Sequence, residues 1–346
     1  MPLQVSIILP IRNEVKHISP LIDSILSNNI DDQCEILIVD GNSTDGSIEI
    51  LENYAYQYPF IKLINNPHSI VSTGFNIALN QSVGDIIIRI DGHCRIPSNY
   101  LSRCLELLNS TDADIVGGNI ETISHGQVGK AIATAQSSLF GVGGVKFRRI
   151  GLKESGYVDS LAFGAHRRKI FAEIGGYDEE MVCNQDDEFN FRAIQAGKKI
   201  WIDPTIKTKY YSRSSYRRLF KQYFNYGYYK IRSIQKRRQI ISMRHIVPSL
   251  FIVSLLSTIY YGLTINNPII STIVFFPYLV CNIFSSIIVS PSVQIIPSIF
   301  ISYWVLHIGY GLGFIWGFIK FVGRWRDTSL KDDHFNREKF ILNSQS

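Results

Sequence analysis

The stretch Ile86-Ile87-Ile88-Arg89-Ile90-Asp91-Gly92-His93 carries most of the information about the fold of this chain. Its β-branched run predicts a buried strand, and Asp91 and His93 follow at the carboxyl end. Open α/β sheets bind ligands in the crevice outside that end of their strands. Carboxylate and imidazole both hold divalent cations, and a cation there would clamp a diphosphate. Because Asp-Gly is also a common tight-turn pair, the triplet alone favours a plain turn, and the decision depends on the rest of the chain.

Strand-like and helix-like segments alternate along the front of the chain. The expected strands are Val5–Leu9, Glu35–Val39, Ile61–Ile64, Asp85–Ile90 and a short one at Ile115–Gly118. The expected helices are one capped by Asn13 and reaching Leu26, then Ser43–Tyr56, Ile70–Leu79 and Pro97–Leu108. This alternation predicts an α/β fold with a mostly parallel sheet flanked by helices.

Acidic residues recur where the expected strands end. Asp40 ends the second strand and Asp91 ends the fourth, so in a parallel sheet both side chains reach one edge. Asp40 would accept hydrogen bonds from a base or ribose, and Asp91 with His93 would hold a metal on phosphates. Asp112-Ala113-Asp114 has a similar spacing but precedes its strand, which places it at the wrong edge.

A third acidic group lies at Gln185-Asp186-Asp187-Glu188, before an expected helix. Acids in a first helical turn complement the helix dipole, which is the plain interpretation. That accounts well for one or two acids and less well for three. A carboxylate near a metal-bound donor would instead serve as a general base.

The back of the chain predicts a membrane segment. Of the 35 Lys and Arg residues, 12 lie in Ile206–His245, which has no Asp or Glu. Between Arg244 and Lys320 there is no charged residue, and the apolar runs Ile246–Ile265, Ile269–Ser290 and Ile295–Ile319 are each long enough to span a bilayer. Basic residues beside spans mark the cytoplasmic face, so the front domain is expected in the cytoplasm, attached to the cell membrane by these spans.

The number of crossings is left open by the sequence. Three spans would put the C-terminus outside, yet Lys320, Arg324 and Arg326 after the last run favour the inside. Either the third run is re-entrant or interfacial, or the charge rule is overruled. The basic and aromatic segment before the spans also allows nucleic-acid binding, but the adjacent spans favour contact with membrane lipids.

Several motifs in order resemble the family 2 inverting glycosyltransferases of the GT-A fold, over about the first 230 residues. The matching motifs are Val5–Glu14 with its Pro-x-x-Asn-Glu turn, Val39–Ser47, Asn76, Asp91-Gly92-His93 in place of Asp-x-Asp, Gly175-Gly176-Tyr177-Asp178-Glu179, and Gln185-Asp186. A closer resemblance is to the succinoglycan-biosynthesis type of glucosyltransferase, carried by Phe140–Gly143, Asn184–Asn190 and Gln222–Gly227.

The resemblance implies a role for each matched residue. Pro10, Arg12 and Glu14 would border the base pocket, Asp40 would bind uracil, Asn76 would contact the donor, and Asp91 with His93 would bind Mn²⁺ or Mg²⁺. Asp186 would be the catalytic base. Asp187 and Glu188 would contact the acceptor or the metal, and Gln222 would contact the acceptor. Asn225 and Tyr226 replace the Arg and Trp typical of processive enzymes, which favours transfer of a single sugar.

These implications define the expected protein. A GT-A domain at 1–205 would precede a basic interfacial segment at 206–245, transmembrane helices at 246–320 and a polar tail at 321–346. By the same resemblance it would move one sugar, glucose or galactose, from a uridine diphosphate sugar to a lipid-linked saccharide at the inner membrane, without a nucleic-acid partner. A metal-dependent nucleotidyltransferase and a non-catalytic membrane scaffold are the alternatives.

Overall fold

The structure is a computed structural model that describes residues 4–28, 30, 34–148, 153–238 and 243–342. It divides into two compact units. The first comprises Met1–Glu121, Gly151–Tyr210 and Leu330–Ser346, and the second comprises Thr122–Ile150 and Tyr211–Ser329. The last residues of the chain thus join its front in one unit, and the division into four segments stays a prediction.

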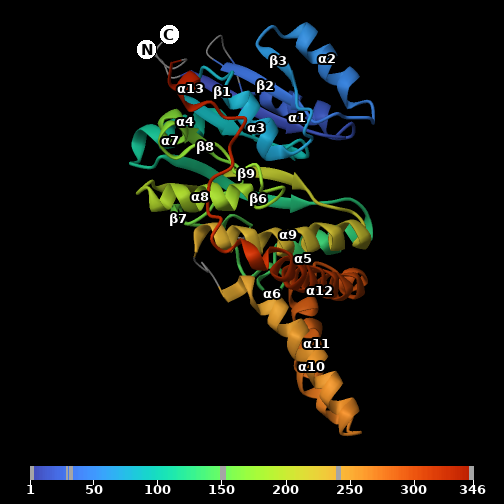
Figure 1. Cartoon of the computed structure of the whole chain (residues 1–346). Helices are drawn as coiled ribbons and strands as arrows, with labels where there is room; N and C mark the ends of the chain where they lie inside the picture. Colours follow the sequence, from blue (N-terminus) through green and yellow to red (C-terminus); the bar gives the residue numbers. More distant parts are fainter. Residues whose placement is uncertain (1–3, 29, 31–33, 149–152, 239–242, 343–346) are drawn as a thin grey trace. The chain divides into compact units, whose positions relative to one another are not determined.

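Within the described residues, nine strands form one sheet in the order β3-β2-β1-β4-β8-β6-β9-β5, with β7 paired to β9 (Figure 1). The strands are β1 (Val5–Ile11), β2 (Cys34–Asp40), β3 (Ile61–Asn65), β4 (Ile86–Arg89), β5 (Cys94–Arg95), β6 (Ile115–Ile123), β7 (Gly156–Val158), β8 (Ala165–Arg167) and β9 (Ile200–Tyr211). Strands β3, β2, β1 and β4 are parallel, and β8 joins β4 antiparallel. The mostly parallel, helix-flanked sheet that the sequence predicted is confirmed.

The central strands are buried on both faces, which explains their unbroken apolar runs. Every residue of β1, β2 and β4 is buried. The helices of this unit are α1 (Ile18–Leu26), α2 (Ser47–Gln57), α3 (Val71–Leu79), α4 (Tyr100–Ser110), α7 (Arg168–Ile174), α8 (Gln185–Gln195) and α13 (Arg337–Leu342). They supply the apolar layers that a parallel sheet requires.

The prediction that Asn13 caps the first helix is wrong. Helix α1 begins at Ile18, and Asn13 instead has a positive φ of 55° in the loop after β1. Its side-chain oxygen accepts a hydrogen bond from the Thr44 amide at 2.8 Å, and its own amide donates to Ser43 Oγ at 2.9 Å. Asn13 therefore ties the loop after β1 to the loop after β2, at the carboxyl edge of the parallel strands.

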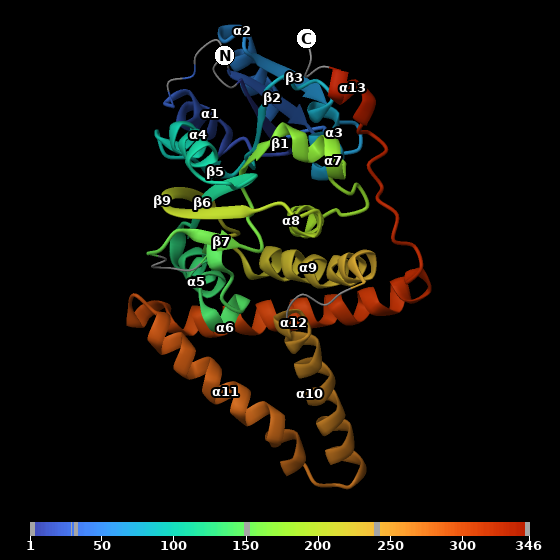
Figure 2. The same cartoon turned by 90° about the vertical axis from the view of Figure 1, so that its left-hand side faces the viewer.

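The last residues of the chain pack onto the first unit. Helix α13 lies beside α7 (Figure 2). Phe340 of α13 is fully buried, and the Arg168 guanidinium lies 3.7 Å from the centre of its ring. His334 Nδ1 and Glu179 Oε2 are 2.6 Å apart, and the Asn80 side-chain amide donates to the His334 carbonyl at 2.6 Å. This tail is thus a part of the first unit.

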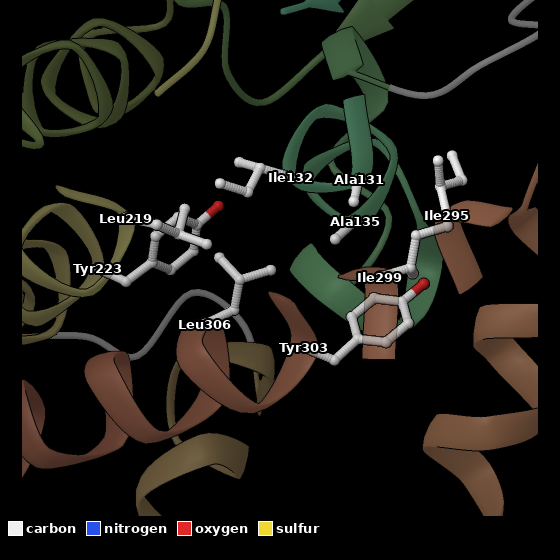
Figure 3. Packing of buried hydrophobic residues seen from close by; sticks show 9 residues of the cluster. All are labelled: Ala131, Ile132, Ala135, Leu219, Tyr223, Ile295, Ile299, Tyr303 and Leu306. Carbon is white, nitrogen blue, oxygen red and sulfur yellow. The ribbon is translucent and has the colours of Figure 1, made fainter. Parts of the chain in front are cut away.

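The second unit is helical. Its helices are α5 (Gly126–Gln136), α6 (Leu139–Val142), α9 (Tyr216–Arg237), α10 (Val247–Thr264), α11 (Ile269–Val289) and α12 (Ile296–Phe321). One apolar cluster joins α5, α9 and α12, with Ile132, Leu219 and Tyr303 among its buried residues (Figure 3). Three helical segments, Val247–Thr264, Ile269–Val289 and Val293–Arg324, are long and apolar enough to cross a membrane.

Candidate active site

Asp40 stands at the carboxyl end of β2, directly opposite Ile11 of β1. Its Oδ2 atom accepts a hydrogen bond from the Ser43 amide at 3.0 Å. Its Oδ1 atom is buried and has no hydrogen-bond partner among the described residues. A buried acceptor without a partner is costly, so this oxygen suits the N–H of a bound base. Pro10 is buried in β1, and Arg12 is exposed just beyond it.

Arg89 is the centre of the site, although the sequence motifs assigned it no role. Its Nε and Nη2 atoms donate to Asp91 Oδ1 at 3.1 and 2.7 Å. Its guanidinium lies 5.4 Å from the centre of the Tyr177 ring. The only sequence signal was a charged residue inside an isoleucine run, where a buried guanidinium requires an acidic partner.

His93 faces Glu14 across the loop after β1. His93 Nδ1 and Glu14 Oε1 are 2.9 Å apart, and the ring meets Tyr210 edge-on at 4.7 Å. Burial alone would lower the pKa of His93, but Tyr210, Glu14 and Asp91 raise that pKa to about 10. Gly92 permits this approach, since a Cβ there would lie 2.8 Å from Glu14 Cγ.

The donor set at this edge fits a divalent cation that also binds a ligand. His93 Nε2 is buried and unpartnered within the described part of the chain, while Nδ1 is held by a carboxylate, which is the usual arrangement of a metal-binding histidine. Cation binding would displace the imidazole proton. The described residues contain no group of three or more His, Cys, Asp or Glu side chains placed to hold a metal ion. Asp91 and His93 would therefore need phosphate oxygens to complete the shell, as Mg²⁺ sites commonly do.

Asp186 lies in the first turn of α8, and its Oδ1 atom accepts from the Asp187 amide at 2.9 Å. Burial raises the pKa of Asp186, the positive charge of Arg89 lowers it, and Asp187 and Asp91 raise it; the net shift is upward. Asp91 and Asp186, from distant parts of the sequence, thus act on each other around one guanidinium. A carboxylate with a raised pKa is suited to accept a proton near neutral pH.

Two predicted site residues have structural roles. Glu188 is buried, and both of its carboxylate oxygens bind Arg192, at 2.7 and 2.9 Å. Asn76 is buried in α3, and its side-chain amide donates to the Tyr177 carbonyl and to Glu179 Oε1, both at 2.8 Å. Asn76 thus contacts the Gly175–Glu179 turn directly, and Glu188 acts through Arg192, whose Nη2 atom donates to the Gly176 carbonyl at 2.7 Å. Contact of either residue with acceptor or donor stays a prediction.

The remaining candidates lie elsewhere. Gln222 is on α9 in the second unit, where its Nε2 atom donates to the Tyr226 hydroxyl at 3.0 Å. Asp112 pairs with Lys199 and Tyr157 near the start of β6, so it takes no part in the strand-end site, as expected. A surface hollow of about 420 Å³ that Phe340 lines is at the opposite end of β4 and lies outside the site.

Comparison with known proteins agrees with this geometry. The chain matches the model of glycosyl transferase family 2 over residues 6–175. It is 34% identical to the succinoglycan biosynthesis protein ExoA of Rhizobium meliloti (strain 1021), over 70% of this chain and 73% of that protein. It is 28% identical to the dolichyl N-acetyl-alpha-D-glucosaminyl phosphate 3-beta-D-2,3-diacetamido-2,3-dideoxy-beta-D-glucuronosyltransferase of Methanococcus voltae, over 75% of this chain and 83% of that protein.

A solved structure shares the fold. The structure of S. aureus TarS 1-349 in complex with UDP-GlcNAc superposes with a TM-score of 0.53 at 14% identity, over 90% of this chain and 91% of that one. At this identity the likeness concerns the fold alone. With the ExoA match and the family model, the sequence and the strand-end site lead to one conclusion: the chain belongs to glycosyltransferase family 2.

Proposed function

We propose that this family 2 glycosyltransferase transfers a single sugar, with inversion, from a uridine diphosphate sugar to a lipid-linked acceptor. The observation that carries the proposal is the cluster at the carboxyl edge of the parallel strands, where Arg89 binds Asp91 and the charges of both act on Asp186. The named relatives support the class, because one is a succinoglycan biosynthesis protein and another acts on a dolichyl-linked sugar phosphate.

The nucleotide would lie over the ends of β1 and β2. The unpartnered Asp40 Oδ1 would accept the N–H of uracil, with Pro10 and Arg12 at the border of the base. The hydrogen bonds of Asn13 to the second loop hold the two loops together. A pocket held in place before binding loses less conformational entropy when the ligand arrives. The TarS structure of the same fold was solved with UDP-GlcNAc, a uridine diphosphate sugar, which agrees with this choice of nucleotide.

Asp91 and His93 would hold Mn²⁺ or Mg²⁺ on the diphosphate, with Glu14 orienting the imidazole. Such an ion, when bound, supplies charge stabilisation to the leaving diphosphate. Arg89 offers a further donor, since its Nη1 atom is buried without a partner in the described part of the chain. The guanidinium fixes one oxygen of Asp91 and leaves the other for the ion.

Asp186 would take the proton of the acceptor hydroxyl as that oxygen attacks the anomeric carbon. The raised pKa of Asp186 brings its basicity closer to the working pH, and the half-buried position limits competition from water. One displacement of this kind inverts the configuration. Asp187, beside it in the same turn, would contact the acceptor, and Gln222 on α9 is proposed to do so as well.

The test is a screen of uridine diphosphate sugars with Mn²⁺, which follows release of uridine diphosphate with and without lipid-linked acceptor. Asp186→Asn should lower turnover by about 10²–10⁴-fold and leave donor binding close to normal. Asp112→Asn is the matched control, because this acid pairs with Lys199 away from the site. Near-normal turnover of the Asp186 variant would discard the assignment of the base.

Release of pyrophosphate in the same screen would instead support the nucleotidyltransferase alternative, and no binding of any sugar nucleotide would support a scaffold. Family membership favours neither of them. Glucose and galactose are the first donors to test, by resemblance to the succinoglycan type. The basic face of α9, with Arg217, Arg218 and Lys221 exposed, would meet anionic lipid heads.

A further inference from the structure

The contacts of the C-terminal tail restrict how the chain crosses the membrane. Residues that follow α12 pack onto the first unit, which holds the candidate active site and is called the catalytic unit below. Asp332 Oδ2 accepts from the Gly176 amide at 3.1 Å, and the Glu179 amide donates to the Lys331 carbonyl at 2.6 Å. With the buried Phe340, these contacts hold the tail on the same side of the membrane as the active site. A chain that leaves and returns to one side crosses an even number of times.

The helix before the apolar segment does not cross. Helix α9 carries seven Lys and Arg residues in 22, and Arg217, Arg218 and Lys221 are exposed. Charges of that number are not tolerated across the hydrocarbon core. Helix α10 therefore starts on the side of the catalytic unit. Of the three apolar helices, two cross or none does.

Helix α12 runs beside α9 over its middle and C-terminal part, and its N-terminal part lies next to α5 and α6 (Figure 2). The two run parallel: a Cβ at Gly309 would lie 3.2 Å from the Phe220 carbonyl oxygen, and one at Gly313 would overlap that of Phe224. Close approach of backbones at small residues is typical of tight helix pairs. Since α9 stays out of the hydrocarbon core, its parallel partner does too.

Polar contacts secure the far end of this pair. Gln235 Nε2 donates to the Phe321 carbonyl at 2.6 Å, and Arg232 Nη2, fully buried, donates to Asp327 Oδ2 at 2.8 Å. The cluster in Figure 3 covers the inner face of α12 with residues of α5 and α9. Because α12 has polar partners at its end and protein along one side, we expect it to lie at the membrane surface.

We propose that α10 and α11 cross the bilayer as a hairpin, while α12 lies in the membrane surface beside α9. At 1.5 Å per residue, 18 and 21 residues reach about 27 and 32 Å, close to the hydrocarbon thickness of about 30 Å. Only 17% of α10 and 11% of the α11 window are buried within the protein, so their apolar faces require lipid. Asn266 and Asn267 form the tip on the opposite side.

The exposed face of α12 fits the lipid boundary. Ile301, Leu312, Trp316 and Ile319 are exposed, and their spacing places them on one face of the helix. Lys320 lies 5.4 Å from the Trp316 ring, and Trp with Lys at a helix end is typical of the water–lipid boundary. The occupant of this face is the acyl region just below the lipid heads. This arrangement also explains why basic residues follow the third apolar run.

Cysteine labelling with a membrane-impermeant maleimide tests the topology in intact cells. Cys183 and Cys281, the half-buried and exposed natural cysteines, are first replaced by serine. Tyr56→Cys, at a side chain that is 92% exposed on α2, reports the catalytic side. Asp333→Cys should label as Tyr56→Cys does, and Asn267→Cys should label from the other side, whichever way the protein is oriented.

Two results would overturn the proposal. If Asp333→Cys labels with Asn267→Cys, the chain crosses three times; if all three positions label alike, the hairpin does not cross. Glu338→Cys is a second exposed reporter on the tail. Spin labels in vesicles test depth: a label at Leu312 in α12 should be shallow and one at Leu256 in α10 deep, and equal depths would contradict an in-plane α12.

Discussion

Replacing Arg89 by methionine should separate its effect on stability from its effect on the base. The variant removes two charge-assisted hydrogen bonds to Asp91 from a guanidinium that is only 4% exposed. Breaking a buried ion pair costs about 3–5 kcal/mol, and the 22% exposure of Asp91 places this pair near the lower value, about 3 kcal/mol. The free energy of unfolding of the catalytic unit should fall accordingly.

The same change should move the pH dependence of activity. Burial raises the pKa of Asp186, and the positive charge of Arg89 lowers it, so loss of Arg89 removes a lowering influence and the pKa rises. The base works only when ionised, so the acidic limb of kcat/KM should move to higher pH. Arg89→Lys, which keeps the charge, should leave that limb near its original position.

Arg103→Met is the matched control. Arg103 binds Asp203 with the same two distances, 3.1 and 2.7 Å, so its loss should also destabilise the protein, by less because Arg103 is 31% exposed. The acidic limb of kcat/KM should not move in that variant. An active Arg89→Met enzyme with an unchanged limb would refute the link between Arg89 and Asp186.

Two further changes test the supports of the site. Gly92→Ala would place a Cβ 2.8 Å from Glu14 and should weaken Mn²⁺ binding in the presence of uridine diphosphate. Electron paramagnetic resonance measures this binding. Gly156→Ala, with open space around its Cβ, should bind Mn²⁺ normally. Phe340→Ala should lower the free energy of unfolding by about 3–5 kcal/mol in denaturant titration, because the ring is fully buried, while Glu338→Ala at the surface should have little effect. Equal unfolding curves for the last two variants would mean that the tail adds nothing to the catalytic unit.

The alternation of strand-like and helix-like segments along the chain was enough to predict the sheet. Continuous apolar runs ending in Asp40 and near Asp91 indicated buried parallel strands, and the shared edge followed from parallel geometry. The convergence of Asp91 and Asp186 depends on a long-range turn, and only the family motifs indicated it. Arg89 was missed because a single charge in a strand does not reveal its partner.

Other features depend on long-range contacts that the sequence pattern does not predict. Asn13 has the composition of a helix cap, yet its bond to Thr44, 31 residues later, fixes a different backbone conformation. The sequence predicted a polar tail at 321–346 and indicated no partner for it. Its place on the first unit comes from Phe340 and from His334, whose partner Glu179 is 155 residues away. Local hydrophobic periodicity does not predict pairs that are so far apart in the sequence.

The position of the tail also has a consequence for biogenesis. The ribosome makes α10, α11 and α12 before it reaches Phe340, and the Arg168 guanidinium has no ring to stack on until then. The Glu179 carboxylate likewise waits for His334. A nascent chain that stops within the apolar helices would thus have an incompletely packed first unit. The enzyme can be completed only after the apolar helices that anchor it have been synthesised.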